Sequence, residues 1–526
     1  MKVLITDNVP EICKTILENS GIETTIKNNL TPAELLEEIG NYEGLIIRSS
    51  SKCTSEVIDR ATKLRAVCRA GVGIDNVDVP AATKRGIIVM NTPGGNTTST
   101  AEHTITLLLS LSRKIPQACN SVREGKWERK KFLGTQVSGK VLGVIGLGRI
   151  GKEVAKRAAA LEMKVIGYDP FISIGTASKL NIHQVKNLDE LLLQSDYISL
   201  HIPLRNDTKN IISAREFDLM KRGVRIINCA RGGILSEDAL VDALETGKVA
   251  GAALDVFEKE PPGDNKLLKF ENVLPTPHLG ALTEEAQSAV AKDAAEQMAD
   301  ALKGNNILNA VNIPVQNPEE YEQLKPFMKL TEKMGSLLIQ LAKDRLISID
   351  IQYSGEISKN NISPVTDSLL AGILEHVLEE NVNFINARIL AKERGININE
   401  IISSTTEDYT NLVLANIKTE SGEQSVTGTV FKNEDPRIET INGFRVDMNP
   451  SGYVLILFGQ DKPGLIGEIG KVLGDQDINI GHMTFGRKTD KSDALVVLNL
   501  DGAVSHDTIV SLEKLECINS AYMLKF

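Results

Sequence analysis

This chain of 526 residues is poor in cysteine, in aromatic residues and in long apolar runs. Its six cysteines form no CxxC pair, so neither a disulfide framework nor a structural zinc site is expected. No run of apolar residues is long enough for a transmembrane helix, and the N-terminus lacks the charged and apolar sections of a signal peptide. We therefore expect a cytoplasmic protein with no membrane partner and no bound metal.

An excess of positive charge is also missing. The formal net charge of −10 argues against a nucleic-acid partner, although it allows a local basic pocket for an anionic small-molecule substrate. The composition is 42% hydrophobic and 24% charged, which is typical of an α/β globular enzyme. A chain of this length is expected to form three or four domains.

Through residue 300, short β-branched runs alternate with helical patterns, which predicts two doubly wound, Rossmann-like α/β domains with parallel sheets. The runs are KVLIT, GLIIRS, RAVCRAG, IIVMNTP, KVLGVIG, KVIGYD, YISLHIP, VRIINCA and VAGAALDVF. Beyond Gly304 this spacing stops at a polar, proline-marked stretch that is typical of a linker. Residues 320–445 mix helices and strands in an α+β pattern. The closing segment has the βαββαβ order of a ferredoxin-like module.

Two helices are expected to connect the first two domains. Ser99 and Glu102 have the spacing of a capping box and would start a helix ending near Arg113, which places a boundary near residue 98. A helix from about Thr283 to Lys303 could cross back to the first domain. The expected domains are 1–97 with 283–304, 98–282, 315–445 and 452–526.

A glycine-rich turn follows the predicted strand KVLGVIG. Gly146 permits the tight turn, Gly148 lets backbone approach a pyrophosphate, and Gly151 lets the next helix pack on the strand. Asp169 ends the following strand, where its carboxylate would bind both ribose hydroxyls and repel a 2′-phosphate, so the pattern predicts NAD. Capping of a turn is the alternative role for Asp169. Further cofactor contacts are expected from Arg149, Ile150, His201, Pro203, Cys229, Ala230, Asp255 and Gly280.

Three side chains suited to hydride transfer follow three later strands, where α/β sheets bind ligands. We expect His278 to abstract the hydroxyl proton, Glu260 to hold the imidazole and favour its protonated form, and Arg231 to grip the substrate carboxylate. Each residue alone also fits an ion pair, a polar turn or a bystander. Their joint placement after a dinucleotide motif indicates catalysis. Of the other histidines, only His201 is placed to line the crevice, and His103 has no recognisable partner pattern.

Motifs of high specificity run through the first 300 residues. They are RAGVGIDNVD, NTPGGNTTSTAEH, GKWERKKFLGTQVSGK, LGRIG, NCARGG, ALDVFEKEPP and PHLGA. On these motifs the chain resembles the D-2-hydroxyacid dehydrogenase family, and within it the long members that oxidise D-3-phosphoglycerate with NAD in serine biosynthesis. The resemblance implies a catalytic Arg, Glu and His that match Arg231, Glu260 and His278.

The resemblance also implies a set of substrate contacts. The residues concerned are Arg48, Arg69, Gly73 and Asn96. Arg48 and Arg69 are suited to the phosphate and carboxylate of phosphoglycerate, with ion pairing at strand ends as the alternative. Arg129 and Lys130 of the WERKK segment would add positive charge from a neighbouring subunit.

Two C-terminal segments resemble regulatory domains of the long members. The segment SVTGTVFKNEDPRIETINGFRVD is similar to an intervening domain that binds an anionic effector or substrate, and the end of the chain is similar to an ACT domain. Family members bind serine between two ACT modules of different subunits, which implies serine as effector, Asp461 and Asn479 as its contacts, and a homo-oligomer, expected to be a tetramer. A helix cap at Asp461 and a turn at Asn479 are the alternatives. Gly459 departs from members that carry an effector-touching side chain there.

Two other functions stay open at this point. One is a glycerate, lactate or formate dehydrogenase of the same fold, which differs in whether Arg48 and Arg69 face a phosphate. The other is an NADH-sensing binding protein of the transcriptional corepressor type, which shares the dehydrogenase core and keeps similar residues. Turnover of phosphohydroxypyruvate with NADH distinguishes all three.

Overall fold

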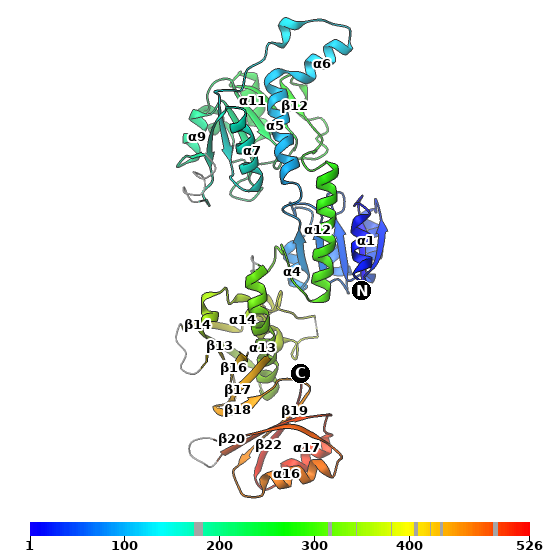
Figure 1. The fold of residues 1–526 in the computed structure, drawn as a ribbon, viewed down its shortest axis with the longest axis vertical. Coiled ribbons are helices and arrows are strands. Elements are labelled where there is room, and N and C mark those ends of the chain that lie inside the picture. Colours follow the sequence, from blue (N-terminus) through cyan, green and yellow to red (C-terminus); the bar gives the residue numbers. More distant parts are fainter. Residues whose placement is uncertain are drawn as a thin grey trace.

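The computed structural model describes residues 1–172, 182–313, 318–342, 344–379, 381–403, 409–420, 422–431, 435–487 and 493–526. Four sheets, each with its own helices, form four units that follow one another along the long axis of the molecule (Figure 1). The second unit lies at one end, next to the first, and the fourth lies at the other end. No helix among the described residues combines the length and apolarity needed to cross a membrane.

The first unit is a parallel sheet with the strand order β2-β1-β3-β4-β5. Its strands are β1 (Lys2–Thr6), β2 (Glu23–Lys27), β3 (Gly44–Ile47), β4 (Ala66–Arg69) and β5 (Ile88–Asn91). Its helices are α1 (Ile12–Asn19), α2 (Pro32–Glu38), α3 (Ser55–Arg60) and α4 (Val79–Lys84), with α12 (Glu284–Lys303) added from later in the chain. Successive residues of β1 point to opposite faces, so Val3 packs towards α12 and Leu4 towards α2 and α3.

Helix α12 crosses back to the first unit, as the sequence predicts. The Thr283 side chain caps its start by accepting a hydrogen bond from the Ala286 backbone N–H, and Gly304 ends it with a φ of 71°. Its buried face, including Met298, packs in the core that also holds Val3. The first unit is therefore built from two separate segments of the chain.

The second unit is a parallel sheet with the order β12-β11-β10-β9-β6-β7-β8. Its strands are β6 (Val141–Ile145), β7 (Lys164–Tyr168), β8 (His183–Gln184), β9 (Tyr197–Leu200), β10 (Val224–Asn228), β11 (Val249–Leu254) and β12 (Val273–Pro275). Helices α5 (Thr97–Arg113) and α7 (Arg149–Ala160) cover one face, while α9 (Leu188–Gln194), α10 (Ala214–Leu219) and α11 (Glu237–Glu245) cover the other. Counted from β6, the order is that of dinucleotide-binding sheets, which confirms the predicted fold class.

The capping box expected at the start of α5 is wrong. The helix begins at Thr97 with Asn96 as its N-cap residue, so Ser99 lies inside the first turn. Ser99 is buried, and its hydroxyl donates to the Gly280 carbonyl at 2.8 Å instead of capping the helix. A partner 181 residues away thus replaces the local one.

The stretch after Gly304 is only partly a linker. Ala310 forms an antiparallel bridge to Met90 of β5, and the Val311 backbone N–H donates to the Val89 carbonyl at 2.8 Å. The Asn312 side chain accepts from the Val89 N–H at 2.9 Å. These bonds fasten the segment along the open edge of the first sheet, while residues 314–317 of the expected linker lie outside the described residues.

The third unit has the mixed strand order β14-β13-β15-β16-β17-β18. These strands are β13 (Leu346–Gly355), β14 (Asn397–Ser403), β15 (Asn411–Thr419), β16 (Glu423–Phe431), β17 (Asp435–Ile441) and β18 (Phe444–Met448). Its helices are α13 (Pro318–Leu341), α14 (Ser363–Leu374) and α15 (Ala387–Glu393). The predicted α+β character of this region is confirmed.

The fourth unit has the predicted ferredoxin-like order, with strands arranged β20-β21-β19-β22. Its elements are β19 (Tyr453–Gln460), α16 (Leu465–Gly474), β20 (Ile480–Arg487), β21 (Asp493–Leu500), α17 (His506–Glu513) and β22 (Ile518–Lys525). Leu455 and Leu457 of β19 pack under α16 and α17, whereas Val454 and Ile456 join the core of the third unit. The last two units therefore share one hydrophobic core.

Candidate active site

The glycine turn after β6 has the backbone that a pyrophosphate site needs. Gly146 has a φ of 91°, which favours glycine, and a side chain at Gly151 would overlap the Gly146 carbonyl. A Cβ added at Gly148 would point into open space, on the side from which a ligand would approach. Helix α7 begins at Arg149, followed by Ile150, so its N-terminal N–H groups lie at the same turn.

Asp169 lies directly beside this turn. Its carboxylate accepts hydrogen bonds from the Leu147 backbone N–H and the Phe171 backbone N–H, both at 2.9 Å. The bond to Phe171 is the turn cap that the sequence left as an alternative, and the bond to Leu147 holds the carboxylate against the glycine turn. Both bonds orient Asp169 at the end of β7, where a ribose would bind.

His201 follows β9 at the point where the strand order of the second sheet reverses. Its Nε2 lies 2.8 Å from the Ser199 hydroxyl, and burial lowers its pKa to about 4. The ring is therefore neutral at physiological pH and can act only as a neutral hydrogen-bonding group towards a cofactor.

This lowered pKa predicts a loss of stability in acid. Between pH 6.5 and 4 the unfolded chain binds a proton that folded His201 does not, so the free energy of unfolding falls as pH falls. Because the residue keeps some exposure, we expect a loss of about 1 to 2 kcal/mol. Denaturant titrations at pH 7.5 and 5 measure how much the free energy of unfolding falls between the two pH values. The fall should be smaller for His201→Gln than for the parent or for the control His183→Gln. Equal losses in all three would contradict this assignment.

His278 and Glu260 form the pair predicted from the sequence. His278 Nδ1 lies 2.8 Å from Glu260 Oε2. Burial raises the pKa of Glu260, but the hydrogen bond and charge of His278 outweigh it and hold that pKa below its ordinary value. Glu260 is therefore a carboxylate that orients the ring through Nδ1 and makes no contact with Nε2 of His278.

Asp255 anchors the loop that carries His278. Its buried carboxylate accepts hydrogen bonds from the Thr276 hydroxyl and the Leu279 N–H, both at 2.7 Å, and from the Gly280 N–H at 2.9 Å. His103 of α5 adds a contact from Nε2 at 3.1 Å. Sequence reasoning missed His103, because its partner Asp255 lies 152 residues further along the chain.

Arg231 reaches across from the second unit to the first. Its Nε lies 3.1 Å from Asp75, and its Nη1 donates to the Ala230 carbonyl at 2.7 Å. Arg69 donates to the Gly73 carbonyl, and any side chain at Gly73 would overlap the Arg231 guanidinium. Gly73 thus permits two guanidinium groups to approach each other. Sequence reasoning missed Asp75, the carboxylate that Arg231 contacts in this structure.

Arg48 and Arg69 provide half-buried positive charge, and Arg69 lies close to both Arg48 and Arg231. Burial and then the charge of Arg231 lower the pKa of Arg69 to about 10, and burial also lowers the pKa of Arg48. The Nε atoms of both side chains are buried and have no hydrogen-bond partner within the described residues. The Arg48 backbone N–H donates to buried Asp7 at 2.7 Å, which holds this strand end in place. Unpaired buried donors of this kind fit an anionic ligand.

The remaining predicted contacts surround the same strand ends. Asn228, missed in the sequence, brackets the turn after β10 by accepting from the Ala230 N–H at 3.0 Å and donating to the Arg231 carbonyl at 2.9 Å. Burial raises the pKa of Cys229 to about 12, so its thiol stays protonated. The Pro203 carbonyl is occupied by the Thr208 hydroxyl at 2.7 Å.

Asn96 is the N-cap residue of α5, whereas Arg129 lies beyond the other end of that helix, in the segment after α6. The Asn96 Oδ1 atom is buried without a hydrogen-bond partner in the described part of the chain, beside the first unit. Arg129 lies in η2 (Arg129–Phe132), next to Lys130. Together with α6 (Ile115–Arg123), this segment forms an arm, and α6 lies at the end of the molecule that the second unit occupies (Figure 1). A 17-residue helix is about 25 Å long, so Arg129 cannot reach the Asn96 end of its own chain.

The two candidate effector contacts do not meet within one chain. Asp461 follows β19 and pairs with Arg487 at 2.9 Å, whereas Asn479 precedes β20 and donates to Asp501 at 2.7 Å. Strand β20 separates them by about 25 Å. Neither residue caps α16, and a side chain at Gly459 would overlap the Cys517 carbonyl, which explains why glycine occupies this position.

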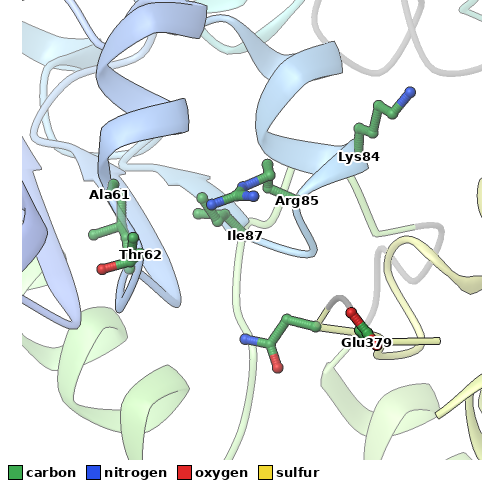
Figure 2. A pocket seen from close by; sticks show the side chains of 8 residues that line it. Ala61, Thr62, Lys84, Arg85, Ile87 and Glu379 are labelled. Atoms are coloured by element: carbon green, nitrogen blue, oxygen red, sulfur yellow. The ribbon is translucent and has the colours of Figure 1, made fainter. Parts of the chain in front are cut away.

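A separate cavity of about 320 Å³ lies between the first and third units. Figure 2 shows that the first unit contributes Thr62, Arg85 and Ile87 to its wall, while the third contributes Glu379. Lys84 also lines the cavity and pairs with Glu393 at 2.8 Å across the two units. The wall carries both signs of charge, so it does not by itself select the anionic effector expected for the intervening domain.

Comparisons with known proteins agree with this geometry. Residues 105–280 match the NAD binding domain of D-isomer specific 2-hydroxyacid dehydrogenase, 323–442 the D-3-phosphoglycerate dehydrogenase intervening domain, and 453–516 the ACT domain. All of this chain aligns with 94% of a D-3-phosphoglycerate dehydrogenase from Synechocystis at 42% identity, and 99% aligns with 99% of one from Archaeoglobus fulgidus at 43%. The D-lactate dehydrogenase from Aquifex aeolicus, solved with NAD and lactic acid, is similar at 29% identity with a TM-score of 0.53. That match covers 58% of this chain and 96% of that one.

Proposed function

Because this chain belongs to the D-3-phosphoglycerate dehydrogenase family, we propose that it oxidises D-3-phosphoglycerate to 3-phosphohydroxypyruvate with NAD, the first step of phosphorylated serine biosynthesis. The observation that carries this proposal is the position of two groups of side chains. The His278–Glu260 pair and the cluster formed by Arg48, Arg69 and Arg231 lie at the carboxyl ends of strands in the two parallel sheets. The glycine turn and Asp169 fit NAD at the second of these sheets.

The chemistry divides between the cofactor and the chain. NAD, when bound, accepts the hydride from C2 of the hydroxy acid. His278 takes the hydroxyl proton at Nε2, because Glu260 already occupies Nδ1. Arg231 exchanges Asp75 for the substrate carboxylate and thereby aligns C2.

Arg48 and Arg69 support a phosphorylated substrate. Both are partly buried in the first unit with an unpaired Nε, a state that is costly unless an anion binds there. Lactate and glycerate carry no phosphate that could use these donors. The pair therefore favours phosphoglycerate over the unphosphorylated hydroxy acids.

The fourth unit supports regulation by serine in an oligomer. Strand β20 is an edge strand with an exposed face, and two copies paired about a two-fold axis would run antiparallel along it. That pairing would bring Asp461 of one copy towards Asn479 of the other, which would create a site for a small zwitterion. Exposed Trp127 and Leu133 on the arm, 79% and 82% accessible, offer a second interface, as a tetramer requires.

A cytoplasmic location is also part of the proposal. All six cysteines are free thiols, and five of them are buried. Free thiols are typical of a reducing compartment.

A coupled set of rate measurements tests the proposed function. Purified enzyme should reduce 3-phosphohydroxypyruvate with NADH. Its kcat/KM should be at least about tenfold higher for 3-phosphohydroxypyruvate than for hydroxypyruvate. With 3-phosphohydroxypyruvate as substrate, kcat/KM should also be at least about tenfold higher with NADH than with NADPH. Added serine should lower the rate. No turnover would indicate an NADH-sensing binding protein, and equal rates with hydroxypyruvate would indicate a different hydroxy-acid dehydrogenase.

A further inference from the structure

One face of α5 holds the loop that carries the catalytic base. Ser99 and Thr100 both donate their hydroxyl groups to the Gly280 carbonyl, at 2.8 and 3.1 Å. His103, one turn further along the helix, contacts Asp255 at 3.1 Å. Ser99 and Thr100 are buried, and His103 is 16% exposed, so solvent competes little for these bonds.

Asp255 connects His103 to the same loop. The loop runs from Thr276 to Gly280, and Asp255 accepts hydrogen bonds from Thr276, Leu279 and Gly280. A buried carboxylate is stable only when donors surround it, and His103 completes this set from a different element. Gly280 is therefore held through its N–H by Asp255 and through its carbonyl by α5.

The held segment needs this support because of the backbone at His278. Its φ of 57° is in the left-handed region, which non-glycine residues rarely adopt and which persists only where the surroundings enforce it. The enforcing bonds begin at the next residue, Leu279. Small changes in this loop would move the imidazole relative to both Glu260 and the substrate hydroxyl.

We propose that His103, Ser99 and Thr100 are positioning residues that fix the His278 loop to α5, so that the base points at the substrate. This inference rests on the proposed function of His278 as the base. Since α5 follows β5 of the first unit directly, the same bonds tie the base to one of the two connections between the catalytic units.

His103 and Asp255 also belong to a group of side chains that could bind a metal ion, but their hydrogen bonds argue against a metal site. His103, Cys229 and Asp255 place ligand atoms within 4.8 Å of one another. Both oxygens of Asp255 already accept hydrogen bonds from backbone N–H or hydroxyl donors. A hydrogen-bonded support for the loop accounts for these three residues.

The test compares His103→Phe and the double variant Ser99→Ala with Thr100→Val against Ser112→Ala. Ser112 is the matched control: it is buried on the same helix and bonds to Leu108 and Tyr197, far from the loop. We expect kcat for phosphohydroxypyruvate reduction to fall about 10- to 100-fold in the first two, as for a base displaced by about 1 Å. The Kd for NADH, from fluorescence titration, should change less than about threefold, and Ser112→Ala should keep its kcat.

Combination with His278→Gln separates this inference from general damage. If the α5 face acts through the base, its substitutions should cause no further loss once His278 is replaced. Three outcomes would each overturn the inference. The first is a combined variant whose loss of kcat is the product of the separate losses. The others are an unchanged kcat in His103→Phe and in the Ser99→Ala, Thr100→Val variant, or a loss of NADH binding as large as the loss of kcat. A parent enzyme without turnover would instead reject the proposed function, and NADH binding by that parent would show that it is folded.

Discussion

Replacing His278 with glutamine is expected to lower kcat for phosphoglycerate oxidation by about 10²- to 10⁴-fold, the range typical of a lost general base. Glutamine can still contact Glu260 but takes no proton from the substrate. The KM for phosphoglycerate should change little, because the arginine cluster that binds the anion is intact. Initial rates over a range of substrate concentrations, measured by NADH absorbance, give both constants.

The control for this prediction is His183→Gln, which makes the same exchange on exposed β8 of the same unit. It should retain the parent kcat. The pH dependence adds a further test, since the acidic limb of the rate profile for oxidation, where a general base becomes protonated, should lose the contribution of the base in His278→Gln alone. A variant that keeps more than about a tenth of the parent kcat would show that another group accepts the proton.

Replacing Arg231 with glutamine should reduce kcat/KM for phosphoglycerate by about 10²-fold or more. The change removes charge-assisted hydrogen bonds to the substrate carboxylate, worth about 3 kcal/mol in total. It also leaves Asp75 without its partner from the second unit. Most of the loss should be in KM, with a smaller part in kcat from misaligned C2.

Arg225→Gln is the matched control, because Arg225 lies at the other end of the same strand β10 and donates to Thr135 at 2.9 Å. Its KM for phosphoglycerate should stay within about twofold of the parent, since it is remote from the arginine cluster. If Arg231→Gln and Arg225→Gln raised KM equally, the carboxylate role of Arg231 would be refuted. Guanidinium added to the assay should restore part of the activity of Arg231→Gln but none to His278→Gln.

Buried strands were predictable, and edge elements were not. Parallel strands with both faces covered read as continuous apolar runs, so β1, β6 and β10 were found from their sequences. Strand β2 has the polar sequence ETTIK and lies at the sheet edge with half-exposed residues, so it carries no such signal. The two-residue strand β8 is too short to show any pattern.

Local sequence patterns gave wrong predictions where a residue far along the chain forms the hydrogen bond instead of a near neighbour. Ser99 and Glu102 match a capping box, but Ser99 bonds to Gly280 across 181 residues. The polar stretch after Gly304 reads as a linker, yet Asn312 pairs with the edge of β5, 223 residues away. In both cases the competing partner is invisible to any window of sequence.

The sequence by itself determined which functional groups follow the strands: spaced glycines, an acid after the second nucleotide strand, and an Arg, a Glu and a His after three strands whose ends lie at one edge of the sheet. Only the tertiary structure decided which side chains form hydrogen bonds and ion pairs with these groups. It placed Asp75 against Arg231 and joined His103 to Asp255, contacts that span 156 and 152 residues. The physical reason is that apolar periodicity and turn residues encode each element locally, whereas a buried charge is stabilised by whichever donor the packing of elements brings to it.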